Sequence, residues 1–373
     1  MAENLYSKYR PKILSEVYGQ ATIVKELQKR TKENTFPQVV YLTGFTGTGK
    51  STLEKIISKT ILCQHKDDSG NPCCICETCL TIQNEKPSNY YYLFNASNLG
   101  IDEMRNIENL SQMKSLSTSK HKVIVIDELQ ELVKSPAASK NLLKAIEKPN
   151  AYTHFMLLSM DDSKIPVAIK NRCVPYKLKP LDFTDIAKYL YFICKSEGVV
   201  IDTKEKMETL ATIADNSNGS VRTAVSYLER CIYSDIWEKD EILAELNLIS
   251  TENLVNIMNL ILSGKIQALD FIDPTKEFID KLRYSFNQLY KYKAGLELDA
   301  YKLGLIKGIV KCNVDVIATV METFTNIMQF NYLNAEIIET SFINLILQIQ
   351  NFKERGGVTI VSEQPRRRMA KES

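Results

Sequence analysis

Gly44-Phe45-Thr46-Gly47-Thr48-Gly49-Lys50-Ser51 decides the fold, because it has the spacing G-x-x-x-x-G-K-[ST] of a phosphate-binding loop. The apolar run Val39-Val40-Tyr41-Leu42 precedes it, and the helix-like segment Thr52-Leu53-Glu54-Lys55-Ile56-Ile57 follows it. Glycines let backbone N–H groups close around phosphate oxygens, and a helix N-terminus adds partial positive charge. The stretch therefore predicts a strand, a nucleotide-binding loop and a helix.

The residues of this loop have expected roles in binding ATP. Lys50 is expected to reach the β- and γ-phosphates, and the Ser51 hydroxyl is expected to ligate Mg²⁺. The remaining nucleotide-binding residues expected here are Gly44, Thr46, Gly47, Thr48, Gly49 and Thr52. The alternative is a glycine-rich turn that happens to hold a lysine, and the correct flanks on both sides argue against it.

Val123-Ile124-Val125-Ile126-Asp127-Glu128 is the second strong signal. Four consecutive β-branched residues are typical of a strand buried on both faces of a parallel sheet. The two acids follow at its carboxyl end, where open α/β sheets bind ligands. We expect Asp127 to hold Mg²⁺ through water and Glu128 to polarise the attacking water. An acidic cap between a strand and a helix is the alternative.

Strands and helices alternate through the first half of the chain, which predicts a parallel sheet with helices on both faces. Three further segments resemble strands. They are Tyr90-Tyr91-Tyr92-Leu93-Phe94-Asn95, His154-Phe155-Met156-Leu157-Leu158-Ser159 and Cys173-Val174-Pro175-Tyr176-Lys177-Leu178. With the two strands above, the predicted fold is an α/β core on a five-stranded parallel sheet.

Cys63, Cys73, Cys76 and Cys79 have a spacing that is typical of a structural zinc site. Four thiolates on two short segments fill a tetrahedral Zn²⁺ and leave no position open for catalysis. Cys74 is a fifth sulfur that could compete as a ligand, and His65 is another conceivable one. The alternative is a set of buried free cysteines.

Composition limits the class of protein. The chain has 373 residues, 44% of them hydrophobic and 25% charged, as in a globular protein of two or three domains. The net charge of +2 does not indicate a nucleic-acid binder, so DNA contact must come from a local patch. No segment resembles a signal peptide or a membrane span, so we expect a cytoplasmic protein, in the host cytoplasm if a phage encodes it.

Four parts are expected along the chain. Residues 1–179 form the nucleotide-binding core with its cysteine insertion at 63–79, and the strand signal stops near Pro180-Leu181-Asp182. Residues 180–245 are expected to form a small helical lid and 246–352 an all-helical domain with apolar residues at helical spacing. Residues 353–373, which contain Pro365-Arg366-Arg367-Arg368, are expected to be a disordered basic tail.

Together these residues resemble the clamp-loader ATPases of the AAA+ class, in particular the bacterial DNA polymerase III gamma/tau subunits. The resemblance covers about residues 5–235. Besides the loop, the cysteines and Asp127-Glu128, it rests on Tyr9-Arg10-Pro11, Gly19-Gln20, Ala96-Ser97-Asn98, Leu142-Leu143-Lys144, Asn171-Arg172-Cys173 and Gly219-Ser220-Val221-Arg222. The cysteine insertion inside an AAA+ core is the most specific of these features.

The resemblance implies a set of further roles. Arg172 matches the family's arginine finger, which reaches into the ATP site of a neighbouring subunit. Arg222 matches the arginine that reaches from the lid to its own nucleotide. Arg10, Pro11, Val17 and Tyr18 match segments that line the adenine pocket. The family loads a sliding clamp onto primer–template DNA with five subunits joined by a collar of their third domains.

Two departures from the family pattern matter. Asn171 replaces the usual serine of the finger motif, and asparagine keeps a hydrogen-bonding side chain. At the position where the family usually has a threonine or asparagine that orients the attacking water, this chain has Met160, between Ser159 and Asp161. Either Ser159 takes over as a catalytic residue, or hydrolysis is weakened.

Three functions are compatible with these residues. The first is an ATP-hydrolysing motor subunit of a clamp loader, with other loader subunits, a sliding clamp and primer–template DNA as partners. The second is another AAA+ motor that remodels DNA, and the third is a non-hydrolysing scaffold subunit of the same complex. Lys50, Asp127 and Glu128 favour the first, whereas Met160 favours the third. We expect no nucleotidyl transfer by this chain itself, because no polymerase-type carboxylate pair is present.

Overall fold

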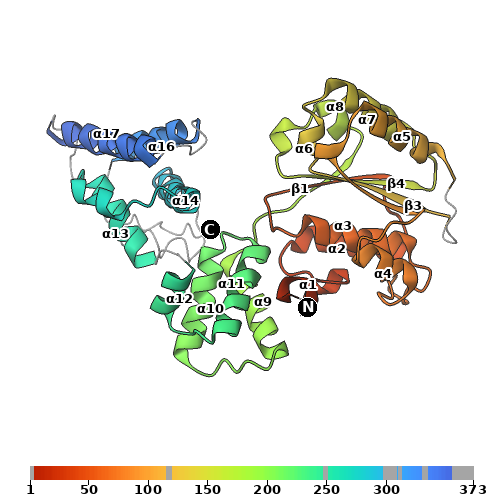
Figure 1. The fold of residues 1–373 in the computed structure, drawn as a ribbon, viewed down its shortest axis with the longest axis horizontal. Helices are drawn as coiled ribbons and strands as arrows, with labels where there is room; N and C mark the ends of the chain where they lie inside the picture. The colour runs from red at the N-terminus through yellow and green to blue at the C-terminus, as the bar shows by residue number, and fades with distance from the viewer. Residues whose placement is uncertain are drawn as a thin grey trace, which may run out of the picture. The chain divides into compact units, whose positions relative to one another are not determined.

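A computed structural model describes residues 4–114, 120–246, 251–296, 309, 313–329 and 335–354. The chain forms two compact units, Met1–Ile242 and Leu243–Ser373 (Figure 1). The first unit includes both the expected core and the expected lid, so the division between residues 179 and 180 stays a prediction.

A parallel sheet of five strands lies at the centre of the first unit. The strands are β1 (Val39–Thr43), β2 (Tyr91–Asn95), β3 (Lys122–Asp127), β4 (Thr153–Ser159) and β5 (Val174–Lys177). Their order is β2-β3-β4-β1-β5, and every neighbouring pair is parallel. The five-stranded α/β core predicted from the sequence is therefore confirmed.

Helices cover both faces of this sheet (Figure 1). One face carries α2 (Ala21–Glu33) and α3 (Lys50–Leu62). The other carries α5 (Ile101–Gln112), α6 (Leu129–Leu132), α7 (Pro136–Glu147) and α8 (Val167–Lys170). Side chains alternate along each strand, so Val125 packs toward α3 while Ile124 and Ile126 pack toward α5 and α7. Burial on both faces explains why the strands are continuous apolar runs.

Short helical elements connect the strands and helices of the sheet region. After β5, the described part of the first unit contains helices and no further strand. The connecting elements are α1 (Leu5–Lys8), η1 (Leu14–Glu16), α4 (Glu77–Gln83), η2 (Ala96–Asn98) and η3 (Asp162–Lys164). The later helices are α9 (Phe183–Ser196), α10 (Lys204–Asn216), α11 (Val221–Ser234) and α12 (Lys239–Glu245), the last of which crosses into the second unit. Asp182 begins α9 by accepting a hydrogen bond from the Asp185 N–H.

The described part of the second unit is helical around an apolar core. Its elements are α13 (Thr251–Leu262), η4 (Ile266–Phe271), α14 (Lys276–Lys293), α16 (Val314–Gln329) and α17 (Ala335–Glu354). The ring of Phe324 lies 5.9 Å from that of Phe286 and 5.8 Å from that of Phe342, which ties α14, α16 and α17 together. Met328 of α16, although apolar, is 37% exposed.

Two expected boundaries lie close to undescribed segments of the chain. The third domain is expected to start at residue 246, directly before the undescribed segment 247–250. The expected tail at 353–373 begins too early, because Lys353 and Glu354 still belong to α17, where the Lys353 ammonium donates to the Ser263 carbonyl at 2.8 Å. The arginines of the tail lie outside the described residues.

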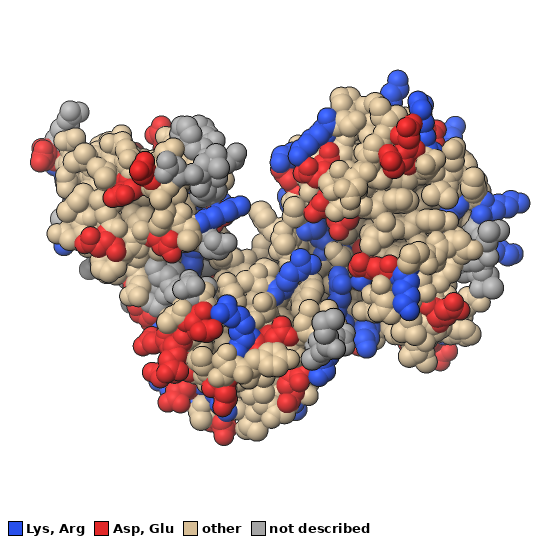
Figure 2. All heavy atoms as spheres, viewed as in Figure 1, with Lys and Arg blue, Asp and Glu red and all other residues tan. Residues whose placement is uncertain are grey.

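Two surface properties bear on possible partners. On the face shown in Figure 2, Lys and Arg side chains of the first unit lie interspersed with Asp and Glu, in keeping with the net charge of +2. None of the helices in the described ranges combines the length and the apolar character that crossing a membrane needs.

Glu54 is an acid buried inside the first unit. It lies on α3 with 2% exposure, accepts a hydrogen bond from the Ser58 hydroxyl at 2.7 Å and lies 3.3 Å from the Tyr91 hydroxyl. Burial raises the pKa of Glu54 to about 7, although Ser58 and the nearby cations Lys55 and Arg10 oppose the shift. Ionising Glu54 in the folded protein therefore costs stability.

We predict that Glu54→Gln stabilises the protein at pH 8 and has a much smaller effect at pH 5. The unfolded chain releases this proton near its ordinary pKa, whereas the folded chain holds it until about pH 7, so native stability falls as pH rises through that window. The substitution removes a cost of up to roughly 3 kcal/mol at pH 8. Urea unfolding at both pH values measures it, with the exposed Glu205→Gln as control. Equal effects of Glu54→Gln at both pH values would contradict the prediction.

Candidate nucleotide-binding site and cysteine cluster

The loop after β1 is folded as a cradle at the carboxyl edge of the sheet. The Gly44 N–H donates to the Ser159 carbonyl at 3.2 Å, which joins the start of the loop to β4. Lys50 begins α3 and is 8% exposed, and its ammonium donates to the carbonyls of Gly44 at 2.7 Å and Phe45 at 2.9 Å. Burial lowers the pKa of Lys50, Asp127 opposes that shift and Arg222 adds to it. The Lys50 ammonium is thus positioned inside the loop, where the charges of Asp127 and Arg222 act on it.

Gly47 joins this loop to the helix that carries Arg222. Its φ is +78°, and a Cβ built there would lie 2.0 Å from the Ser220 hydroxyl oxygen, so only glycine fits. The Gly47 carbonyl accepts from the Val221 N–H at 3.1 Å, at the start of α11. Arg222 is the next residue, and its guanidinium lies over the Tyr6 ring at 5.2 Å from the centroid. The loop and α11 therefore bring Arg222 to the same site as Lys50.

Asp127 and Glu128 end β3 at this edge. Burial raises the pKa of Asp127, a shift that the Glu128 N–H opposes by donating to Asp127 Oδ1 at 2.8 Å. Glu128 has a left-handed backbone, with φ of +55°, which turns the chain into α6. Its Oε2 accepts from the amide of Asn95 at 3.1 Å, and Asn95 lies opposite Asp127 in the β2–β3 register. Asn95 is a site residue that the sequence analysis did not single out.

Ser51 and Asp127 suit the role of magnesium ligands by their chemistry, because Mg²⁺ prefers oxygen donors. Within the part of the chain that the structure describes, the Ser51 hydroxyl makes no hydrogen bond, and Asp127 uses only Oδ1. A hydroxyl and a carboxylate oxygen are thus available beside the loop. Ser51 and Asp127 therefore fit the Mg²⁺ ion that the sequence implies.

A pocket beside the loop contains the residues expected to contact adenine. Arg10, Pro11, Val17 and Tyr18 line it together with Gly47, Gly49, Thr52, Tyr6 and Tyr189. The Arg10 guanidinium donates through Nε to the Thr52 hydroxyl at 3.1 Å, and the rings of Tyr18 and Tyr189 lie 4.9 Å apart. Aromatic and apolar walls suit a planar base. Tyr6 and Tyr189 were missed because they come from α1 and α9, far from the loop in sequence.

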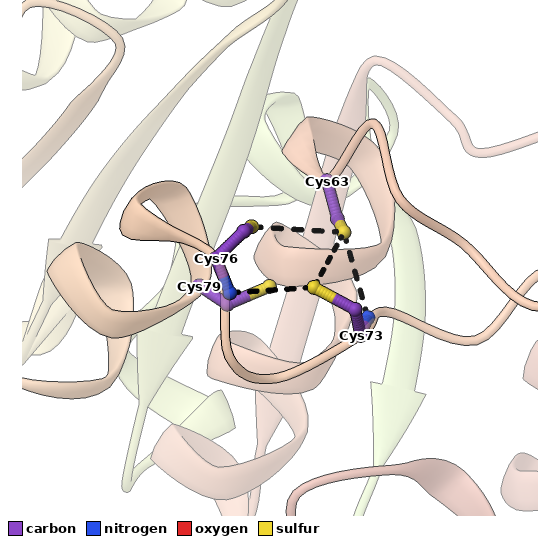
Figure 3. A group of neighbouring side chains, drawn as sticks. All are labelled: Cys63, Cys73, Cys76 and Cys79. Carbon is purple, nitrogen blue, oxygen red and sulfur yellow. Dashed lines mark hydrogen bonds between the residues drawn. The ribbon is translucent and has the colours of Figure 1, made fainter.

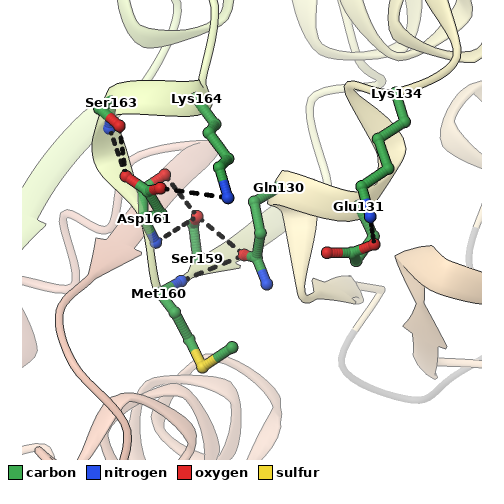
Figure 4. Close-up of polar contacts among 8 residues, drawn as sticks. All are labelled: Gln130, Glu131, Lys134, Ser159, Met160, Asp161, Ser163 and Lys164. Carbon is green, nitrogen blue, oxygen red and sulfur yellow. Dashed lines mark hydrogen bonds and ion pairs between the residues drawn. The ribbon is translucent and has the colours of Figure 1, made fainter. Parts of the chain in front are cut away.

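The end of β4 has an arrangement of its own (Figure 4). Ser159 is fully buried, and its hydroxyl donates to Gln130 Oε1 at 2.9 Å. Met160 is 43% exposed, and its sulfur accepts from the Thr46 hydroxyl. The Ser159 hydroxyl also lies 3.1 Å from the Asp161 carbonyl oxygen and accepts from the Asp161 N–H at 3.2 Å, so its hydrogen bonds are all made within the chain.

Arg172 lies at the opposite edge of the sheet from the loop. It comes two residues before β5, and Val174 of β5 lies opposite Val40 near the start of β1. The five residues of β1 separate the two edges by roughly 15 Å. The guanidinium donates to the Ala168 carbonyl at 2.9 Å and pairs with Glu147 at 3.4 Å. Arg172 is therefore directed away from the loop of its own chain.

Cys63, Cys73, Cys76 and Cys79 come together at the end of α3 and the start of α4 (Figure 3). Their four sulfurs lie within 4.8 Å of one another, with Cys63 at 3.7 Å from Cys73 and 4.0 Å from Cys76. Four sulfurs at about 2.3 Å from a tetrahedral zinc lie about 3.8 Å apart, so the cluster fits the ion.

The surroundings of the four sulfurs differ. Burial raises the pKa of the Cys76 and Cys79 thiols, so in the absence of an ion these two favour the protonated form. Burial favours a higher pKa for Cys73, but backbone N–H groups of Ile75 and Cys76 lower it to about 6. Cys74 lies outside the group, and its sulfur contacts the carbonyls of Lys12 and Pro72. His65 is exposed and also lies outside the group. The four cysteines expected as ligands are thus the four that converge.

Comparisons with known proteins find relatives of this chain among DNA polymerase III subunits. Residues 19–182 match the family model of the DNA polymerase III delta subunit. The Bacillus subtilis DNA polymerase III subunit tau is 30% identical over 305 residues, which are 79% of this chain and 53% of that protein. The DNA polymerase III subunit gamma of Buchnera aphidicola subsp. Schizaphis graminum is 32% identical over 256 residues, covering 68% of this chain and 66% of the relative. This chain thus spans about half to two thirds of these relatives.

A solved structure also matches. It is the Thermotoga maritima RuvB Holliday junction branch migration motor, with a TM-score of 0.44 and 18% identity, over 78% of this chain and 86% of that one.

We predict that the purified protein contains about one zinc ion per chain. Cys63→Ser removes one of four thiolates and is expected to reduce the zinc content severely, because a structural site needs all four. Cys74→Ser is the matched control and is expected to keep the ion. Elemental analysis of protein purified without chelator measures both. Loss of zinc from Cys74→Ser with retention in Cys63→Ser would contradict this ligand assignment.

Proposed function

Because this chain belongs to the DNA polymerase III gamma/tau family of clamp-loader subunits, we propose that it is an ATP-driven motor subunit of a sliding-clamp loader. In this role it binds ATP with Mg²⁺, assembles with other loader subunits and hydrolyses ATP while the clamp is placed on primer–template DNA. A pentamer is the assembly that the family resemblance implies.

The observation that carries the proposal is the convergence of four charged groups at one edge of the sheet. Lys50 comes from the loop after β1, Asp127 and Glu128 from the end of β3, and Arg222 from α11. The Lys50 ammonium donates to the Gly44 carbonyl, and the Gly47 carbonyl of the same loop accepts from the Val221 N–H, the residue before Arg222. Cations stabilise the phosphates, and Glu128, held by Asn95, is the candidate base for the attacking water.

The position of Arg172 supports an active site shared between subunits. At the far edge of the sheet it cannot reach a nucleotide on its own Lys50, and an arginine supplied in trans stabilises charge on a transferring phosphoryl group. Its pairing with Glu147 is a surface ion pair, with Arg172 36% and Glu147 57% exposed, and such pairs are weak enough to exchange partners.

One experiment separates this function from its alternatives. ATP hydrolysis is measured for the protein with its partner subunits, with and without primed DNA and clamp. Stimulation by both together is expected for a loader motor. Hydrolysis that responds to DNA but not to the clamp favours another DNA-remodelling motor, and ATP binding without hydrolysis favours a scaffold subunit.

We predict that Glu128→Gln keeps ATP binding and lowers the hydrolysis rate by at least about a hundredfold, because general-base catalysis contributes factors of this size. Lys50→Ala removes the cation that meets the β- and γ-phosphates and is expected to weaken ATP binding itself. Equilibrium nucleotide binding and single-turnover hydrolysis distinguish the two variants. Turnover by Glu128→Gln at the parent rate would contradict the assignment of the base.

We predict that Arg172→Ala leaves ATP binding to the isolated chain nearly unchanged and lowers stimulated hydrolysis in the assembled complex by orders of magnitude. Mixing tests action in trans. Subunits with Arg172→Ala are combined with subunits carrying Lys50→Ala, so that some interfaces pair an intact loop with an intact neighbouring arginine. Partial recovery of hydrolysis is expected. If mixed complexes demonstrably form and recover nothing, the shared site is wrong.

A further inference from the structure

Gln130 is a buried amide at the carboxyl edge of the sheet, two residues after Glu128. It lies on α6 and is 5% exposed. Its Oε1 accepts two hydrogen bonds from the end of β4, one from the Ser159 hydroxyl at 2.9 Å and one from the Met160 N–H at 3.1 Å (Figure 4). The carboxamide is thus held on β4 by two separate donors.

These contacts determine which way the amide faces. A backbone N–H can only donate, so the atom opposite Met160 N must be the oxygen of Gln130 and not its nitrogen. The NH₂ group is therefore turned away from β4. Among the residues that the structure describes, the NH₂ group has no hydrogen-bond partner. It is not one of the completely buried polar atoms that lack a partner, so part of it is accessible to solvent.

The contacts of Gln130 lead toward the nucleotide loop through Met160. In Figure 4 the amide nitrogen and the Met160 thioether leave the strand edge in the same direction. The Met160 sulfur accepts a hydrogen bond from the Thr46 hydroxyl, so Met160 lies against the phosphate-binding loop. Contacts thus run from Gln130 through Met160 to Thr46, across the ends of β3, β4 and β1.

Several groups at this edge are hydrogen-bond acceptors, so a donor such as the Gln130 amide can interact with them. Met160 offers a weak acceptor and no donor. Asp127 and Glu128 are acceptors when ionised, and an ATP γ-phosphoryl group carries acceptor oxygens only. A neutral donor fixed in advance at this edge suits charge that develops on those oxygens.

We propose that the Gln130 NH₂ group donates a hydrogen bond to a γ-phosphoryl oxygen of ATP and so acts as a catalytic residue; this inference rests on the proposed function. During hydrolysis the water oxygen bonds to the γ-phosphorus and its proton goes to Glu128. The bond from phosphorus to the β–γ bridging oxygen breaks, and ADP leaves with that electron pair. Gln130 holds the phosphoryl group in line throughout, while Ser159 positions Gln130.

Gln130→Glu tests the contact with little change in shape. A glutamate keeps one oxygen for the Ser159 hydroxyl and the Met160 N–H, so a purely structural Gln130 tolerates the change. The NH₂ donor, however, becomes an oxygen that repels phosphate. We expect affinity for a slowly hydrolysed ATP analogue to fall about tenfold or more, because a hydrogen bond to a charged group is lost. Affinity for ADP, which lacks the γ-phosphoryl group, is expected to stay within about threefold.

Gln112→Glu is the matched control. Its Nε2 donates a hydrogen bond within the chain, to the Lys148 carbonyl at 3.0 Å, and its backbone carbonyl lies 3.4 Å from the Asn150 amide, just before β4 at the opposite edge of the sheet. The change in charge and the lost donor are the same, and the ATP-to-ADP affinity ratio is expected to stay at the parent value. Met160→Asn in the Gln130→Glu background supplies a neutral donor beside the loop and is expected to restore part of the ratio.

The outcomes separate the inference from the function on which it rests. If the parent binds ATP and hydrolyses it under clamp and DNA stimulation while Gln130→Glu keeps the parent affinity ratio, the inference alone is overturned. A parent that binds no ATP overturns both. If thermal unfolding shows that Gln130→Glu does not fold, Gln130→Met, uncharged and without a donor, takes its place, and a parent affinity ratio there overturns the contact.

Discussion

Parallel pairing of all five strands is the constraint on which the rest of the first unit depends. Because the strands run the same way, their carboxyl ends form one edge, and the register puts Thr43 beside Ser159 and Asn95 beside Asp127. The residues that follow each strand therefore lie along the same edge of the sheet. The phosphate loop, the acids and Gln130 follow the carboxyl ends of neighbouring strands for this reason, although 86 positions separate Gly44 from Gln130 in sequence.

The loop is also the point where the helical part of the first unit is tied to the sheet. Gly44 would place a Cβ 2.6 Å from the Leu178 carbonyl, and Gly47 would place one 2.0 Å from the Ser220 hydroxyl oxygen. Both glycines let neighbouring segments approach closely. The phosphate cradle and the start of α11 consequently form one packed arrangement, in which the Gly47 carbonyl accepts from the Val221 N–H at 3.1 Å.

Local patterns predicted most of the fold and the central part of the site. The phosphate loop, the acidic strand end and the four cysteines are each readable within a short window, because their chemistry needs a fixed spacing. Asn95 and Gln130 were not readable in this way, since their roles come from strand register and from a hydrogen bond across to β4. Tyr6 and Tyr189 needed the packing of α1 and α9 on the loop. The sequence correctly predicted that a strand ends at Ser159, but it did not predict that the Ser159 hydroxyl is buried.

The two edges of one sheet also limit what a single chain can do. Lys50 and the start of the helix that carries Arg222 lie at the carboxyl edge, where the Val221 N–H donates to the Gly47 carbonyl, and Arg172 lies at the amino edge roughly 15 Å away. One nucleotide cannot contact both edges, so either Arg172 serves only its ion pair with Glu147 or it serves a nucleotide on another chain. The ion pair alone is a weak explanation, because exposed pairs contribute little to stability. Under the proposed function, Arg172 would exchange this ion pair for the phosphates of a nucleotide on a neighbouring subunit, and assembly would then be part of the catalytic mechanism.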